Sequence, residues 1–331
     1  MTEGAPTLSQ VAAHAGVSLA TASRALNGSA RTVNADLQAR VLASAAALGY
    51  SANVQAQAMA RGTSNTVAVV VGDIADPYFS SIASGVIRVA DARGLIVTLT
   101  ATGADASREA AILGALKGQR PRAVILAGSR MLDADTAELD AVERGGARVA
   151  LIGSELPGVR SVGIRNREGA ADLARALVGR GYTDFAVLAG PQNLLTARDR
   201  TAGFLDVVPD ARVVTGSFSR DGGYRTMAAL LADGVRPGCV FAVTDVMAVG
   251  AMAALRDAGL APGADVAVAG FDDIPLVQDV TPSLSTVALP LAEIGARALE
   301  LALADEPDAA LAAPFAGTVV LRASTPECVR G

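Results

Sequence analysis

Residues 8–27 read LSQVAAHAGVSLATASRALN, which is the pattern of two short helices joined by a tight turn. Thr7 can cap the first helix, because its hydroxyl can accept a hydrogen bond from the backbone of the first turn. Gly16 falls where the turn needs a positive φ, a conformation that a side chain would resist. Ser18 supplies an N-cap for the second helix. The stretch therefore predicts a helix-turn-helix unit, which places its second helix in the major groove of DNA.

The second helix is expected to carry one cation among hydroxyls and an amide on its exposed side. Such a surface suits both contacts to phosphates and the reading of base edges. The residues expected on it are Leu19, Ala20, Thr21, Ser23, Arg24 and Asn27. An ordinary helical hairpin with a capped second helix is the alternative interpretation of the same pattern.

Two further segments complete the N-terminal region. A third helix is expected over residues 34–48, because leucine, valine and alanine recur on one stripe before Gly49, which can stop the helix. Residues 50–62, YSANVQAQAMARG, predict a short helical connector capped by Asn53. Three small helices followed by a connector would form a compact headpiece.

The distribution of charge matters more than its sum. The 331-residue chain has a net charge of −5, which by itself argues against a nucleic-acid partner. Residues 1–62, however, carry four arginines against Glu3 and Asp36, so this region is mildly basic. We expect one headpiece to bind DNA weakly, and dimerisation to supply the second set of contacts. The length also predicts two or three domains.

The composition argues against several other classes of protein. Cys239 and Cys328 are too few for a disulfide framework, and Cys239 lies in an apolar run that predicts a core position. Residues 1–6 lack the features of a signal peptide, and no apolar run is long enough to span a membrane. His14 is the only histidine, so no metal site and no cofactor are expected. These observations predict a soluble, cytoplasmic protein.

From residue 66 onward, apolar strand-like runs alternate with helical patterns. This alternation is typical of parallel sheets that are covered by helices on both faces, an α/β fold. The number of units favours two sheets, with a ligand cleft at the carboxyl ends of the strands. The expected strands are 66–71, 96–100, 123–126, 148–152, 185–188, 213–216, 240–243 and 266–269. The expected helices are 80–93, 107–116, 136–143, 167–180, 222–232 and 246–257.

Short motifs follow the headpiece in a definite order: DPYF at 76–79, RDRTAGF at 198–204, TD at 244–245, GFDD at 270–273 and TPSLST at 281–286. Together with the helix-turn-helix block, these motifs resemble the lac repressor (LacI/GalR) family of bacterial transcription regulators over essentially the whole chain. The resemblance implies a ligand-responsive regulator, most often a repressor of a sugar or related catabolic operon. It implies a homodimer or a tetramer on a near-palindromic operator, and a sugar-like effector bound in a domain that resembles periplasmic binding proteins.

The resemblance also implies a domain organisation. It predicts a helix-turn-helix headpiece at 1–52, a hinge helix at 53–62 and an effector-binding and dimerisation domain at 63–331. The last of these is expected to divide into two subdomains, approximately 63–162 plus 290–323 and 163–289 plus 324–331.

For the DNA interface, the resemblance implies contacts from the cap, the second helix and the hinge. The residues concerned are Thr7, Leu8, Ser18, Leu19, Ala20, Thr21, Ser23, Arg24, Asn27, Tyr50, Asn53, Ala56 and Met59. Leu19 and Ala20 can read only apolar features such as a thymine methyl group, which leaves most polar readout to Arg24. Met59 replaces the leucine that typically wedges into the minor groove, and Ala52 replaces a proline of the family.

For the effector site, the resemblance implies Asp76, Tyr78, Phe79, Arg200, Phe218, Asp245 and Asp272. Arg200 would bind the ligand through its planar guanidinium group. Phe218 would stack on the ligand. Structural roles are the alternatives. Asp76 and Asp245 could be helix caps, while Arg200 could be a surface charge and Phe218 a core residue.

The chain departs from the sugar-responsive pattern at two places. Gly153 stands where an aspartate often follows the strand, and Arg165 replaces the aspartate of a Val-Asp-Asn motif. A lost carboxylate and a new guanidinium make an anionic or phosphorylated effector more plausible. A transport binding protein without a DNA role, and an α/β enzyme, remain the alternatives. The enzyme is disfavoured because the chain has no Walker lysine motif and no Gly-x-Ser-x-Gly elbow.

Overall fold

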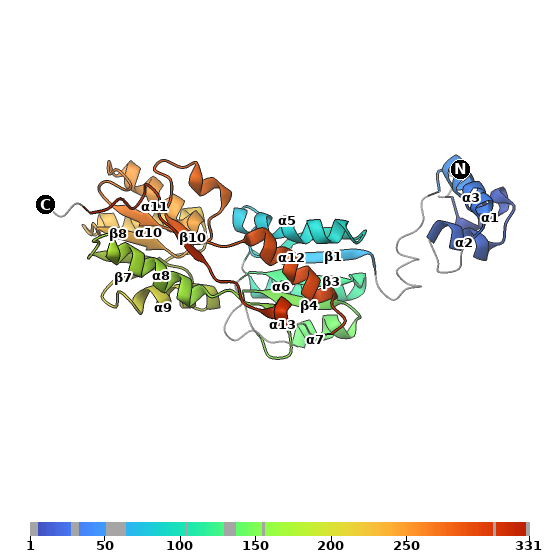
Figure 1. Cartoon of the computed structure of the whole chain (residues 1–331), viewed down its shortest axis with the longest axis horizontal. Helices are drawn as coiled ribbons and strands as arrows, with labels where there is room; N and C mark the ends of the chain where they lie inside the picture. Colours follow the sequence, from blue (N-terminus) through green and yellow to red (C-terminus); the bar gives the residue numbers. More distant parts are fainter. Residues whose placement is uncertain are drawn as a thin grey trace. The chain divides into compact units, whose positions relative to one another are not determined.

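The computed structural model describes residues 6–27, 33–50, 64–103, 105–128, 137–153, 156–306 and 309–328. The chain divides into two compact units, Met1–Ser64 and Asn65–Gly331, and each is described by itself (Figure 1). The expected hinge helix at 53–62 lies outside the described residues.

Within the described residues, the N-terminal unit is formed by α1 (Leu8–Ala15), α2 (Leu19–Asn27) and α3 (Ala35–Ala47). The Thr7 side chain accepts a hydrogen bond from the Gln10 backbone N–H, and Gly16 has a φ of 63°, both as the sequence predicts. A core of small side chains lets the helices approach closely. It consists of Val11, Ala12, Ala15, Ala22, Ala25, Val41 and Ala45.

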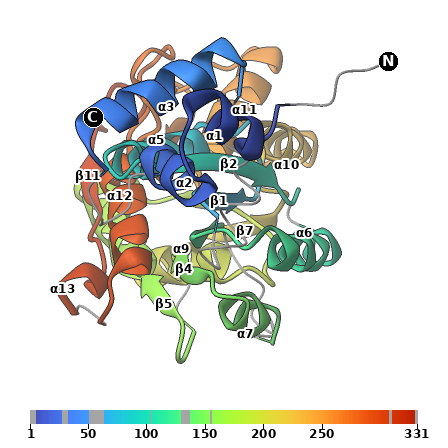
Figure 2. The same ribbon diagram turned by 90° about the vertical axis from the view of Figure 1, so that its right-hand side faces the viewer.

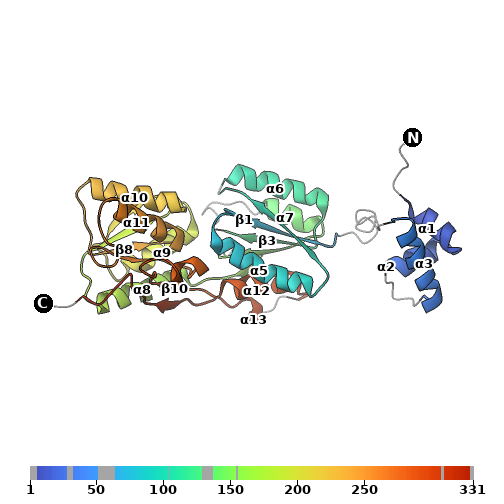
Figure 3. The ribbon, with the colours of Figure 1, turned by 90° about the horizontal axis from the view of Figure 1, so that it is seen from above.

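The first lobe of the larger unit is built on a parallel sheet with the strand order β2-β1-β3-β4-β5. Its strands are β1 (Thr66–Val71), β2 (Ile96–Ala101), β3 (Ala123–Ala127), β4 (Arg148–Ile152) and β5 (Arg160–Val162). Helices α5 (Pro77–Asp91) and α12 (Leu291–Leu303) cover one face, and α6 (Ala106–Gln119) and α7 (Ala137–Arg144) cover the other (Figures 2 and 3). The valines at 67, 69 and 71 pack on the α5 side, while those at 70 and 124 pack on the α6 side.

The second lobe repeats this plan with the strand order β7-β6-β8-β9. Its strands are β6 (Phe185–Ala189), β7 (Arg212–Thr215), β8 (Cys239–Ala242) and β9 (Ala267–Ala269). Helix α8 (Asn166–Gly179) packs with α9 (Leu195–Leu205), and α10 (Arg220–Ala232) packs with α11 (Asp245–Asp257). Cys239 is fully buried in β8, as its apolar surroundings predict.

The chain returns to the first lobe after the second. The antiparallel strands β10 (Thr286–Ala288) and β11 (Thr318–Val320) flank this return, which also includes α13 (Ala309–Ala312). Helices α12 and α5 then pack so closely that glycine is required at their contact. A Cβ added at Gly85 would lie 1.8 Å from the Ala292 carbonyl oxygen, and one at Gly295 would lie 2.0 Å from that of Ile82.

Every strand and helix expected between residues 66 and 269 is present, with ends that differ by a few residues at most. Most of the elements that the sequence did not predict are short: β5, β10, β11, α13 and the 3-10 helix η1 (Pro275–Gln278). Helices α9 and α12 are longer and were not predicted either. Each helix within the described ranges is too short or too polar to cross a membrane.

Candidate DNA interface and effector pocket

The outer face of α2 presents side chains that can reach DNA. Leu19, Ala20 and Arg24 are exposed, and Leu19 retains 50% of its accessible surface. The Arg24 Nε donates to the Ala20 carbonyl oxygen at 3.0 Å, so the stem of this side chain lies along the helix. The face therefore combines an apolar patch at the start of the helix with a cation one turn later.

The start of α2 is capped as the sequence predicts. The Ser18 Oγ accepts from the Thr21 backbone N–H at 3.1 Å, and the two hydroxyl oxygens lie 2.8 Å apart. Ser23 is half-buried on the same helix. Exposed hydroxyls at a helix N-terminus suit contact with a phosphate, because the first backbone N–H groups also point there.

The other residues expected at the DNA interface have different surroundings. The Thr7 hydroxyl is part of the cap of α1, while Leu8 and Tyr50 pack against the headpiece core and are half-buried. Only the backbone of Asn27 is described, as the end of α2. Asn53, Ala56 and Met59 lie outside the described residues.

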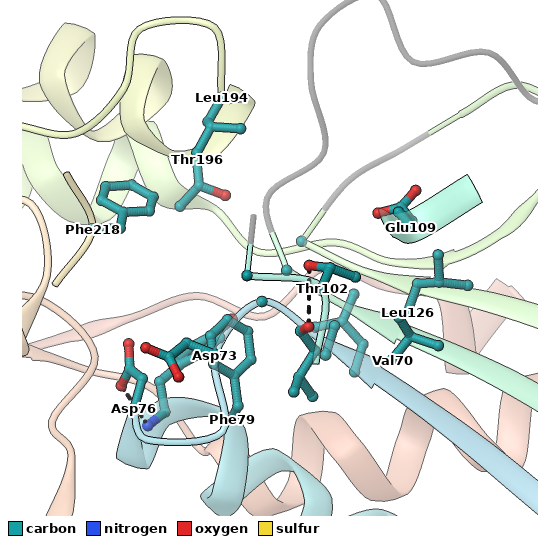
Figure 4. Close-up of a pocket in the computed structure, with 18 of the residues that line it drawn as sticks. Val70, Asp73, Asp76, Phe79, Thr102, Glu109, Leu126, Leu194, Thr196 and Phe218 are labelled. Atoms are coloured by element: carbon teal, nitrogen blue, oxygen red, sulfur yellow. Dashed lines mark hydrogen bonds between the residues drawn. The ribbon is translucent and has the colours of Figure 1, made fainter. Parts of the chain in front are cut away.

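A cavity of about 590 Å³ lies at the carboxyl ends of the strands of both lobes. The first lobe contributes the segments that follow β1, β2, β3 and β4, and the second lobe contributes the starts of α8 and α9 and the segments after β7 and β8. Figure 4 shows Asp73 and Asp76 on one side of this space and Phe218 on the other. Six of the seven expected effector residues line it: Asp76, Tyr78, Phe79, Arg200, Phe218 and Asp272.

Arg200 is buried, with 2% of its side chain exposed, so the alternative of a surface charge is wrong. Its Nε donates to Asn166 Oδ1 and its Nη1 to the Val243 carbonyl oxygen, both at 2.8 Å. Its Nη2 forms an ion pair of 2.8 Å with Asp272 Oδ1, and its guanidinium carbon lies 3.9 Å from the centre of the Phe271 ring. The arginine thus joins α8 and α9 to the ends of β8 and β9.

Asp272, which also lines the pocket, has an unusual backbone conformation. Its φ is 119°, and that of Asp273 is 56°, although neither residue is glycine. Burial raises the pKa of the Asp272 carboxyl, while the neighbouring Arg200 acts to lower it. Strained backbone of this kind clusters at functional sites, where surrounding contacts hold it in place.

Asp245 does not line the pocket, contrary to the expectation that it contacts the effector. Its side chain is fully buried, and it accepts hydrogen bonds from Thr286 Oγ1 at 2.7 Å and from the Ile274 backbone N–H at 2.9 Å. Burial raises the pKa of this carboxyl to about 6. Thr244 is both the pocket residue at this strand end and the N-cap of α11, so the capping alternative for Asp245 is also wrong.

Asp76 and Phe218 line the pocket and also make the structural contacts that the sequence left open as alternatives. The Asp76 carboxylate caps α5 by accepting from the Tyr78 N–H at 2.9 Å, and it also lines the pocket. Phe218 is half-buried against Gly190, where a Cβ would lie 1.9 Å from its ring. The rings of Tyr78 and Phe79 meet edge to face at 5.0 Å.

The structure places one of the two residues that depart from the sugar-responsive pattern in the pocket and the other outside it. Gly153 lines the pocket with a φ of 77°. Arg165 does not line it, and its half-exposed guanidinium pairs with Glu168 at 3.4 Å. The guanidinium that suggested an anionic effector therefore lies away from the site, so this expectation loses one of its two grounds and keeps only the missing carboxylate at Gly153. Sequence reasoning also missed Asp73, Thr244 and other polar residues at strand ends, although the strand-end rule could have found them.

Within the described residues, no group of His, Cys, Asp and Glu side chains could hold a metal ion. The fold and the two sites define a DNA-binding regulator with an attached ligand-binding domain. Residues 7–53 match the model of the bacterial regulatory proteins of the lacI family, and residues 174–325 match a periplasmic binding protein-like domain.

Whole-length relatives agree with these matches. The HTH-type transcriptional regulator GalS of Salmonella typhimurium is 33% identical over 307 residues, which cover 90% of this chain and 89% of that protein. GalR of Escherichia coli is also 33% identical, with 90% and 88% covered. The chain belongs to the lacI family. It is a transcription regulator, so the alternatives of an enzyme and of a binding protein without a DNA role are set aside.

Solved structures share the fold over almost the whole chain. The lac repressor dimer bound to operator and the anti-inducer ONPF has a TM-score of 0.82 at 26% identity, covering 98% of this chain and all of that one. The complex of the transcriptional regulator CelR with cellobiose has a TM-score of 0.68 at 27% identity, covering 96% and 99%.

Proposed function

We propose that this regulator represses an operon for the use of a sugar or related polyhydroxylated compound, and that this compound is its effector. The observation that carries the proposal is a pocket between two lobes, with the buried pair of Arg200 and Asp272 at its floor and Phe218 at its wall. Such a pair offers donors and acceptors to hydroxyl groups, while an aromatic face packs on the apolar side of a sugar ring. Relatives named as a ribose operon repressor and a cellobiose-bound regulator support this class.

The proposed effector residues are those of the pocket: Asp76, Tyr78, Phe79, Arg200, Phe218 and Asp272. We place Asp245 outside this set, as a residue that holds the segment carrying Asp272. Its bond to the Ile274 N–H ties that segment to the start of α11.

The DNA partner is an operator with two related half-sites. Two headpieces in a homodimer would each place α2 in a major groove, and the symmetry of the operator would mirror that of the dimer. The lac repressor, which shares this fold, is a dimer on its operator. We place the protein in the cytoplasm, where operator DNA is found.

Effector and operator binding would be coupled through the lobes. A ligand that contacts both lobes favours one arrangement of them, and it changes operator affinity only if that arrangement also binds DNA differently. Such coupling is typically about 1–3 kcal/mol and is reciprocal.

The experiment is a comparison of operator affinity with and without ligand. The purified chain selects its site from random DNA, and fluorescence anisotropy then measures affinity for that site in the presence of each member of a panel of sugars. At least one sugar that raises the melting temperature should change operator affinity by about 5- to 150-fold. If every sugar that binds leaves operator affinity unchanged, the proposal is wrong.

The matched variants are Phe218→Ala, in the pocket, and Val213→Ala, on the exposed strand β7. The first should lose much of the response to the sugar while it keeps operator binding. The second should behave like the wild type. Equal responses of the two variants would place the effector elsewhere.

A further inference from the structure

Carboxylates outnumber cations around the pocket. Among the lining residues that the structure describes, Arg200 is the one cation, and the carboxyl side chains are those of Asp73, Asp76, Asp105, Glu109, Glu138 and Asp272, of which Glu138 pairs with Lys117 at 2.9 Å. The described lining is therefore acidic in composition.

Arg200, the one cation among the described lining residues, already has bonding partners within the protein. Arg200 pairs with Asp272 at 2.8 Å, and it donates to Asn166 and to the Val243 carbonyl oxygen. An anionic ligand would have to compete with a buried carboxylate for this guanidinium. A neutral hydroxyl group of a ligand needs only to share the N–H groups of Arg200. It can do so without separating Arg200 from Asp272.

Asp73 and Asp76 form the least balanced part of the wall. Asp73 accepts from the Ala75 backbone N–H and Asp76 from that of Tyr78, both at 2.9 Å, and no described cation forms an ion pair with either. Burial raises the pKa of Asp76, and the charge of Asp73 adds to this while that of Arg200 opposes it, so the two carboxylates lie within electrostatic reach of each other. Two neighbouring carboxylates repel an anion and attract a cation.

Aromatic rings complete this end of the pocket. Figure 4 shows Phe79 beside Asp73 and Asp76, with Phe218 across the space from them. The faces of such rings attract ammonium groups and also pack on the apolar faces of sugars. Rings and carboxylates together suit an uncharged or positively charged ligand.

We infer that the pocket selects its effector by charge, accepting neutral or amine-bearing polyhydroxylated compounds and rejecting phosphorylated or acidic ones. This inference rests on the proposed function of the pocket as the effector site. It also reverses the preference for an anionic ligand that the sequence suggested.

The charge of the pocket can be measured without knowing the effector. Ser217 lines the pocket and is itself exposed, so Ser217→Cys in a Cys328→Ser background provides a reporter thiol, while Cys239 is fully buried. The thiol is reacted with a cationic trimethylammonium methanethiosulfonate and with an anionic sulfonate analogue. Each rate is divided by the rate of the same reagent with free β-mercaptoethanol, which removes the intrinsic difference between the reagents.

We expect the corrected cation-to-anion rate ratio to reach about tenfold, and to fall toward one in 1 M salt. Adding Asp73→Asn and Asp76→Asn should lower the ratio severalfold, since asparagine keeps an oxygen that can accept from the Ala75 and Tyr78 N–H groups and removes both charges. A ratio near or below one, or a ratio that the two substitutions do not change, overturns the inference.

A matched ligand series provides the second measurement. Galactose, galactosamine, galacturonate and galactose 6-phosphate share one scaffold, and the corresponding glucose series serves in parallel. The neutral or amine-bearing member should raise the melting temperature of the full chain at concentrations at least about tenfold lower than its anionic counterparts. Tighter binding of an acid or phosphate overturns the inference. Failure of every bound sugar to alter operator affinity would instead overturn the proposed function. The cation-to-anion rate ratio of the reporter thiol would still report the charge of the pocket.

Discussion

Replacing Asp245 with asparagine tests the role that the structure gives to this buried carboxyl. Burial raises its pKa from 3.8 to about 6. Because the pKa is higher in the folded state, folding favours the protonated acid. This contribution to stability is complete below about pH 4 and is lost as the pH rises through about 6. A shift of about two pKa units corresponds to about 3 kcal/mol.

Asparagine changes both the hydrogen bonds and the titration. Its carbonyl oxygen can still accept from Thr286, but its amide group then faces the Ile274 backbone N–H and leaves that buried donor without an acceptor. An unsatisfied buried donor costs about 1–3 kcal/mol. Because asparagine does not titrate, the variant should be less stable than the wild type by about this amount near pH 4.5. The difference should then move in favour of the variant by about 2 kcal/mol between pH 4.5 and pH 7.5, because about 1 kcal/mol of the total change falls below pH 4.5.

The assay is urea unfolding of the full chain at several pH values, with linear extrapolation to water. Asp210→Asn, at an exposed position outside the pocket, is the matched control for loss of one charge. The reasoning is refuted if the stability difference between Asp245→Asn and the wild type is the same at both ends of the pH range. It is also refuted if the control variant shows the same pH dependence.

Arg24→Ala should weaken operator binding by about 1–3 kcal/mol and relax the preference at one base pair of each half-site, as measured on single-base operator variants. An equal loss on every sequence would assign this arginine to phosphate contact. Met59→Gly should abolish specific operator binding but not effector binding in calorimetry, because the side chain is expected to act as an apolar wedge; unchanged operator affinity contradicts this. Phe218→Ala should weaken effector binding by about 1 kcal/mol in the same calorimetric assay, and unchanged affinity would remove the ring from the site. Gly85→Ala should destabilise the protein by about 2 kcal/mol or more in urea unfolding, whereas Gly114→Ala, with no heavy atom within 4 Å of the added methyl group, should be neutral or stabilising. Equal effects of the two would contradict the close α5–α12 contact.

Much of the fold could be predicted because the strands carry a strong local signal. Strand β1, TVAVVV, is apolar on both faces and is followed by turn residues, so its alternation with helices is visible in the sequence. Strands β5, β10 and β11 have three residues each, which is too short for a periodic pattern. The pairing of β10 with β11 also joins segments that α12 and α13 separate, and local sequence carries no information about that contact.

The site was predictable by position but not by orientation. Adjacent residues at a strand end point in opposite directions, so the motif Thr244-Asp245 could place either side chain in the pocket. The structure turns the threonine toward the pocket and buries the aspartate behind it. For the same reason, the sequence could not decide whether Arg165 faces the ligand or Glu168. Orientation depends on packing from distant segments, which no short motif contains.

The segment at 270–273 shows why a strained backbone persists at this site. Glycine at Asp272 or Asp273 would relieve a positive φ, and strain of this kind costs about 1–3 kcal/mol at each residue. Glycine would also remove a carboxylate, and each carboxylate has its own partner: Arg200 at 2.8 Å inside the pocket and Arg322 at 2.7 Å outside it. The strained turn sends two consecutive carboxylates to two different arginines. The two ion pairs therefore account for the aspartates that stand at this strained turn in place of glycine.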